Sequence, residues 1–100
     1  MTVNLTANAR RRLQQIRAYY TLAGNSKKGR KVTQAILKEA KKLEDYPYLG
    51  QEEELLESLG LEHRYLLVDR LYKIIYFITG TNLFITDIFD TRQDPSKMKG

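Results

Sequence analysis

Basic side chains in the last third of the chain are the residues best suited to chemistry. They are Arg64, Arg70, Lys73 and Arg92, which lie in or between strand-like runs. A guanidinium contacts two phosphate oxygens at once, and an ammonium supplies a compact point charge. Pairing of the strands as hairpins would bring several of these cations onto one face of a sheet. We therefore expect them to converge on one exposed concavity that grips an anionic macromolecule.

His63 is the only histidine of the chain. Its ordinary pKa of about 6.5 suits proton transfer near neutral pH. A lone histidine at the entrance of a strand is more often a half-exposed edge residue, and geometry decides a catalytic role before the pKa does. We expect His63 at such an edge, and we keep it as a secondary catalytic candidate beside Arg64, Lys73 and Arg92.

The composition excludes several classes of protein. One hundred residues without an internal repeat are enough for one hydrophobic core, so residues 1–100 are predicted to form a single domain. The absence of cysteine excludes disulfides, thiolate metal sites and cysteine nucleophiles, and we expect no cofactor. No apolar run reaches transmembrane length, and the first residues lack the apolar segment of a secretory signal. We therefore expect a cytoplasmic protein with no membrane partner.

The charge is unevenly distributed along the chain. Residues 1–45 hold eleven Lys or Arg against three acids, and residues 46–100 hold six against nine, which gives +8 and −3 within the formal net charge of +5. A basic half indicates an acidic partner, either nucleic acid or an acidic polypeptide. The solvated faces of two helices explain the same charge, so that alternative stays open.

Two helices are predicted in the first half of the chain. Residues 3–5 form a short alternating strand, and Thr6 stands where an N-cap hydroxyl accepts from the first helix amides. Apolar residues then recur at helical spacing along 9–23 and again along 32–43. A Gly-Asn pair ends the first helix, and Ser26 is a candidate cap for the second. Because the link is short, the helices must turn back on each other as a hairpin.

Three strands are predicted in the second half of the chain. β-branched and aromatic residues are dense along 64–68, 71–78 and 83–89. Asp69-Arg70 and residues 79–82 read as the turns between them. The middle strand has apolar residues on both of its faces, so it should be central in the sheet and covered by helices on one side. Residues 51–60 are predicted to form a loop. The fold is therefore predicted to be α+β, in the order β-α-α-β-β-β, with a helical hairpin on a mainly antiparallel four-stranded sheet.

The order of these motifs resembles a known family. The first helix ends in AYY, the turn Pro47-Tyr48-Leu49-Gly50 follows the basic second helix, and RYLLVDRLYKIIYFI and IFDTRQDP complete the chain. This arrangement resembles the RelE/ParE superfamily of bacterial type II toxins over nearly its whole length. The resemblance implies a compact cytoplasmic toxin in a hetero-oligomer with a cognate antitoxin, whose C-terminal segment wraps and neutralises it.

Two activities divide that superfamily. RelE-like members cut messenger RNA in the ribosome without a metal, whereas ParE-like members poison DNA gyrase. In the resemblance, Arg64, Lys73 and Arg92 fall near positions that RelE-like nucleases use. No His or Tyr follows the last strand to act as acid or base, which favours the ParE-like action on gyrase. A RelE-like mRNA endonuclease is the alternative, and a non-enzymatic basic module that binds nucleic acid through the helical hairpin is the second.

Overall fold

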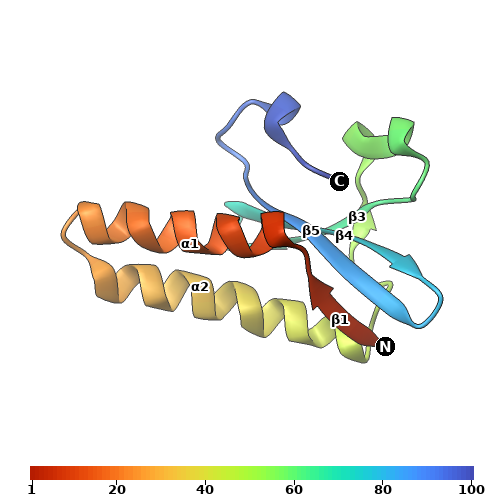
Figure 1. Ribbon diagram of the computed structural model, residues 1–100, viewed down its shortest axis with the longest axis horizontal. Coiled ribbons are helices and arrows are strands. Elements are labelled where there is room, and N and C mark those ends of the chain that lie inside the picture. Colours follow the sequence, from red (N-terminus) through yellow and green to blue (C-terminus); the bar gives the residue numbers. More distant parts are fainter.

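The computed structural model describes residues 1–100 and has helices on one side of a sheet (Figure 1). The helices are α1 (Ala7–Leu22) and α2 (Ser26–Lys41). The strands are β1 (Thr2–Leu5), β2 (Gln51–Glu52), β3 (Arg64–Val68), β4 (Tyr72–Thr79) and β5 (Asn82–Asp90). Short 3-10 turns follow α2 at η1 (Lys42–Glu44), β2 at η2 (Glu54–Leu59) and β5 at η3 (Pro95–Lys97). No helix is both long and apolar enough to cross a bilayer.

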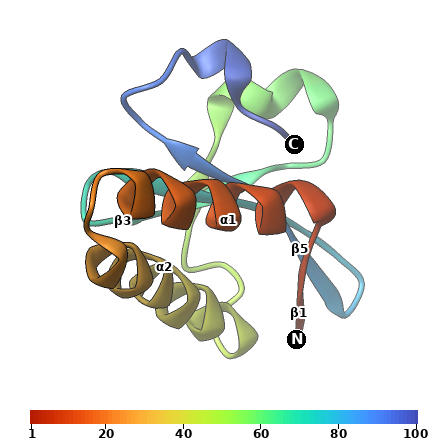
Figure 2. The same cartoon turned by 60° about the vertical axis from the view of Figure 1, so that its left-hand side comes forward.

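The two helices begin at side-chain caps and lie side by side in both views (Figure 2). Thr6 caps α1 as predicted, because its hydroxyl accepts from the Ala9 amide at 3.2 Å. The prediction of Ser26 as the second cap is wrong: Asn25 accepts from the Lys28 amide at 3.3 Å instead, and Ser26 is already helical. A Cβ on Gly29 would lie 3.0 Å from the Tyr20 Cβ, so glycine lets the helices approach closely.

The sheet has five strands in the order β1-β5-β4-β3-β2. β1 runs parallel to β5, and every other neighbouring pair is antiparallel. The α+β class, the helical hairpin and the central position of β4 are confirmed, but the predicted count of four strands is wrong. The additional strand is β2, whose two residues pair with the start of β3. Residues 51–60 are therefore not simply a loop, since η2 also forms there and Leu56 is buried.

The sheet is covered on both faces. Tyr72, Ile74 and Tyr76 of β4 point toward the helices and belong to the main core. On the other face Ile75 packs with Phe89, with Leu56 from η2, and with Met98 from the C-terminal segment. Figures 1 and 2 show η2 and that segment on the side of the sheet away from the helices. The alternation of faces along β4 matches the period of a strand.

Candidate functional site

A cleft of about 300 Å³ lies between α1 and the ends of β4 and β5. Its lining combines apolar, aromatic and charged side chains: Arg12, Gln15, Ile16, Tyr19, Tyr72, Ile88, Phe89, Asp90, Arg92 and Gln93. Tyr72 is 5% exposed, whereas Tyr19 is 62% exposed. Tyr19 therefore lies at the surface of the cleft. The cleft offers a partner an exposed aromatic ring above a buried floor.

Arg92 stands at this cleft in a forked contact with Asp90. Its Nε and Nη2 lie 3.1 and 2.8 Å from the two carboxylate oxygens, and the Arg92 amide donates to the same group at 2.9 Å. These hydrogen bonds hold the pKa of Asp90 below its ordinary value. Asp94 does not share this contact; its carboxylate accepts from the Ser96 amide at 3.0 Å and caps η3. The Arg92 side chain is still 63% exposed, so it can reach a partner.

Arg12 ties the wall of the cleft to the C-terminal segment. Its Nε donates to the Asp87 carboxylate at 3.1 Å, and its Nη2 donates to the Lys97 carbonyl at 3.3 Å. The second Asp87 oxygen accepts from the Lys99 amide at 2.8 Å. The Asp87 side chain is fully buried. One carboxylate thus joins α1, β5 and residues 97–99.

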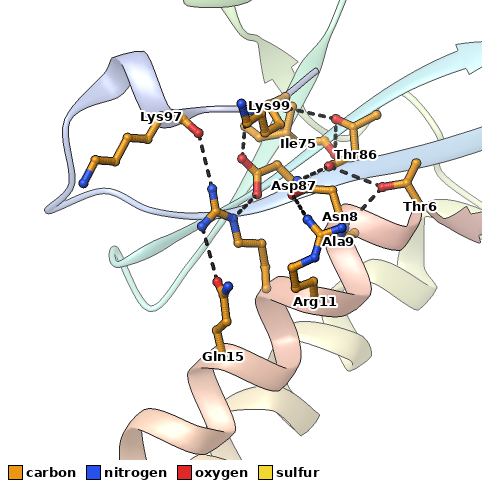
Figure 3. A network of polar contacts seen from close by, with 11 residues as sticks. Thr6, Asn8, Ala9, Arg11, Gln15, Ile75, Thr86, Asp87, Lys97 and Lys99 are labelled. Carbon is orange, nitrogen blue, oxygen red and sulfur yellow. Dashed lines mark hydrogen bonds and ion pairs between the residues drawn. The ribbon is translucent and has the colours of Figure 1, made fainter.

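Thr86 extends this network beside an irregularity in the β4–β5 ladder, where the register shifts next to Ile75. Its carbonyl accepts from the Asn8 amide group at 2.9 Å and from the Thr6 hydroxyl at 3.4 Å. Its own hydroxyl donates to the Lys99 carbonyl at 3.2 Å (Figure 3). The start of α1 and the C-terminal segment are therefore both fastened at this irregularity.

Lys73 lies on the sheet face away from the helices. Its Nζ is 2.7 Å from the Glu53 carboxylate and 4.2 Å from the centre of the Tyr65 ring. The Glu53 side chain is 3% exposed. The charge of Lys73 is therefore matched inside the protein and is shielded by an aromatic ring.

Arg64 lies on the helix-facing side, because it pairs with Tyr76 across the β3–β4 ladder. Its Nη1 donates to the Gly50 carbonyl at 2.8 Å, and the guanidinium carbon lies 5.1 Å from the centre of the Tyr48 ring. The Tyr76 hydroxyl accepts from the Gly50 amide and donates to the Pro47 carbonyl, both at 2.9 Å. Arg64 therefore fastens the Pro47–Gly50 turn.

His63 is 2% exposed, so the prediction of a half-exposed edge residue is wrong. Its ring packs edge-on against Phe77, with centroids 5.3 Å apart, and neither ring nitrogen has a hydrogen-bond partner. Burial lowers the pKa of His63, and nearby Gly100 and Glu53 oppose that shift only in part. The imidazole is therefore a neutral packing group beneath the C-terminal segment.

The predicted convergence of Arg64, Lys73 and Arg92 does not occur. Arg64 and Lys73 lie on opposite faces of the sheet, and only Arg92 reaches the cleft. Sequence reasoning missed the ion pair of Asp87 with Arg12 in the wall of the cleft. An acid inside the apolar run NLFITDIFD was the available signal for Asp87, because a buried carboxylate requires a partner.

Comparison with known proteins shows the family of this fold and site. A family model described as the ParE toxin of the type II toxin-antitoxin system, parDE, matches residues 3–95. The chain therefore belongs to the ParE toxin family and is the toxin component of a type II toxin-antitoxin module, with an antitoxin as its partner. The prediction of the RelE/ParE superfamily is confirmed.

A solved structure has the same fold. It is described as the chromosomal ParDE TA system from P. aeruginosa, and it is 21% identical to this chain with a TM-score of 0.75. The alignment covers 90% of this chain and 95% of that one. No curated protein sequence is similar enough to count as a relative.

Proposed function

We propose that this toxin arrests growth by acting on DNA gyrase through a contact surface, without a hydrolytic step of its own. The ParE family assignment supports this target class over messenger RNA. One observation carries the proposal: three side chains that an RNA-cleaving mechanism would need at one phosphate, Arg64, Lys73 and His63, are separated and either bonded or buried inside the fold.

Metal-free RNA cleavage needs a base, an acid and cations gathered around one phosphate. Lys73 is neutralised by Glu53, and Arg64 on the opposite sheet face holds the Gly50 carbonyl. His63 is buried and neutral, out of reach of a substrate. This arrangement favours a non-hydrolytic toxin over a RelE-like nuclease.

The cleft beside α1 is the surface that we assign to the target. Tyr19 and Arg92 are exposed at this cleft, and tyrosine and arginine are enriched among residues that dominate protein interfaces. In this proposal Arg92 contacts the partner. Arg64, Lys73 and His63 support the fold around β3 and β4 and do not touch the target.

Induction of the toxin in cells separates the two targets. We expect gyrase-dependent DNA breaks before any change in the 5′ ends of messenger RNA, and inhibition of purified gyrase by the purified chain. Ribosome-dependent mRNA cleavage without DNA breaks would refute the proposal.

Two matched substitutions test the surface. Arg92→Gln removes the guanidinium at the cleft, whereas Arg70→Gln removes an exposed guanidinium from the β3–β4 turn. At equal expression and equal thermal stability, Arg92→Gln should raise the concentration that inhibits gyrase by about tenfold or more, the size of an interface hot spot. Arg70→Gln should leave it unchanged. Equal inhibition by both variants would remove the cleft from the proposal.

A further inference from the structure

The helical hairpin carries nearly all the excess positive charge of the molecule. α1 and α2 with their short link, residues 7–41, hold ten Lys or Arg and one acid, Glu39. The rest of the chain holds seven basic residues and eleven acids. Like charges at this density repel one another, and their repulsion opposes compact folding. An anionic partner on the hairpin would relieve that repulsion.

Most of these cations lie on the side of the hairpin that faces away from the sheet. Helical spacing places Lys27, Lys31, Lys38 and Lys41 in one stripe of α2, opposite the buried Ile36. All four lysines are exposed. The stripe runs from one end of α2 to the other, and Figure 1 shows the helix pair reaching beyond the sheet at its far end.

α1 adds to the same side. Its exposed Arg10 and Arg17 lie about a quarter turn from the buried Ala9, on the side of α1 that meets α2. We call the six side chains together the basic face: Arg10, Arg17, Lys27, Lys31, Lys38 and Lys41. None of them forms an ion pair, because the ion pairs of the chain are those of Arg12, Lys42, Lys73 and Arg92. Their charge is therefore available to a ligand.

The residues between these cations indicate which anionic macromolecule fits. The exposed positions between these cations are mostly polar or small, namely Gln14, Ala18 and Gln34, and Leu37 at 44% exposure adds an apolar side chain but no aromatic ring. A protein interface has a charge-depleted core with aromatic or apolar anchors. A single nucleic-acid strand is held by stacking on aromatic rings. The tyrosines of α1 do not serve that purpose here, since Tyr19 lines the cleft and Tyr20 packs against Gly29.

We propose that the basic face binds the phosphate backbone of a nucleic-acid duplex without reading its sequence. Such binding needs only regularly spaced cations, because it gains its free energy from the release of counterions. Lys27 and Lys41 are fourteen positions apart on α2, which corresponds to about 21 Å along the helix axis. A stripe of that length faces several consecutive phosphates. This site is separate from the cleft and does not depend on the choice of gyrase as the target.

The test measures how the affinity of the full chain for a fluorescent 20-base-pair DNA depends on salt. We expect log K to fall steeply with log salt concentration, by about 0.9 for each phosphate neutralised. The variant Lys27→Gln/Lys31→Gln/Lys38→Gln should lower the magnitude of this slope by about 2 to 3. The control Arg70→Gln/Lys97→Gln/Lys99→Gln removes the same charge from exposed positions outside the hairpin, and it should keep the wild-type slope.

Three results would overturn the proposal. One is the absence of duplex binding by the wild type at low salt, a measurement that needs no variant. Another is an equal loss of slope in the control variant, which would show that the salt dependence reflects the net charge of the protein and not the basic face. The third is tighter binding of a poly-glutamate peptide than of DNA through the same lysines, which would assign the face to an acidic polypeptide. The affinity for a duplex RNA of equal length shows which nucleic acid supplies the phosphates. Similar affinities for RNA and DNA support recognition of the backbone of both duplexes. A clear preference identifies the preferred duplex as the ligand.

Discussion

The Tyr76 hydroxyl holds together the turn on which Arg64 depends, so Tyr76→Phe should destabilise the fold. The hydroxyl accepts from the Gly50 amide and donates to the Pro47 carbonyl, both at 2.9 Å. Burial raises the pKa of Tyr76, so the hydroxyl keeps its proton at neutral pH. Tyr76 is fully buried, and no water can replace the lost oxygen without opening the site.

The size of the loss follows from what the substitution leaves behind. Phenylalanine keeps the ring in the core but leaves the Gly50 amide without an acceptor. A buried donor without a partner costs about 1 to 3 kcal/mol, so we expect a loss of about 2 kcal/mol in the free energy of unfolding. That corresponds to about 30-fold in the unfolding equilibrium, and to about 8–10 °C in the melting temperature of a domain of this length.

Urea denaturation of the wild type and the variant measures this difference. Tyr65→Phe is the matched control, because it also removes one hydroxyl, but from an exposed hydrogen bond of 3.2 Å to Gln51. We expect the control to change stability by less than about 0.5 kcal/mol. A Tyr76→Phe variant as stable as Tyr65→Phe would show that the hydroxyl does not hold the turn, and the structural role given to Arg64 would fail with it.

Two further substitutions test groups on the other face of the sheet. Burial lowers the pKa of His63, so the unfolded chain binds a proton at a higher pH than the folded chain does. The free energy of unfolding should therefore fall as the pH drops below about 6.5. His63→Leu should weaken this pH dependence, measured by urea denaturation at pH 7.5 and 5.5. A dependence unchanged in His63→Leu would assign it to other groups. Asp87→Ala leaves the Arg12 Nε and the Lys99 amide without an acceptor. We therefore expect the free energy of unfolding to fall by about 2–3 kcal/mol. We also expect trypsin to cleave faster after Lys97, which mass spectrometry can measure. Cleavage at the wild-type rate would contradict this account of the C-terminal segment.

The periodicity of the chain was sufficient to predict both helices and four of the five strands, all but β2. Apolar spacing and the Thr6 cap gave the first helix, and dense β-branched and aromatic residues gave three strands with β4 at the centre. These signals are local, because each depends on residues within one or two turns of helix or one strand. The family resemblance depends on their order, which explains why it was also correct.

The covering of the second sheet face could not be predicted in the same way. Met98 and His63 are buried there because η2 and the C-terminal segment meet over Ile75, far away in sequence. Neither segment has a strong period of its own, and residues 51–60 read as a loop for that reason. Burial of His63 depends on this tertiary contact, so its local sequence indicated an exposed edge instead.

The separation of Arg64 from Lys73 has a single geometric cause. Taking Asp69-Arg70 as a two-residue turn pairs Val68 with Leu71, and that register places Arg64 on the same face as Lys73. In the structure the connection has three residues, Asp69 to Leu71, and Val68 pairs with Tyr72.

This shift of one residue turns Arg64 to the opposite face of the sheet, because side chains alternate along a strand. It also sets Arg64 opposite Tyr76 across the ladder, on the same side as the Pro47–Gly50 turn. The same register therefore separates Arg64 from Lys73 and places Arg64 where it contacts the Pro47–Gly50 turn. If an inserted or deleted residue in the β3–β4 connection left both the fold and the toxicity intact, the position of Arg64 would have no bearing on either.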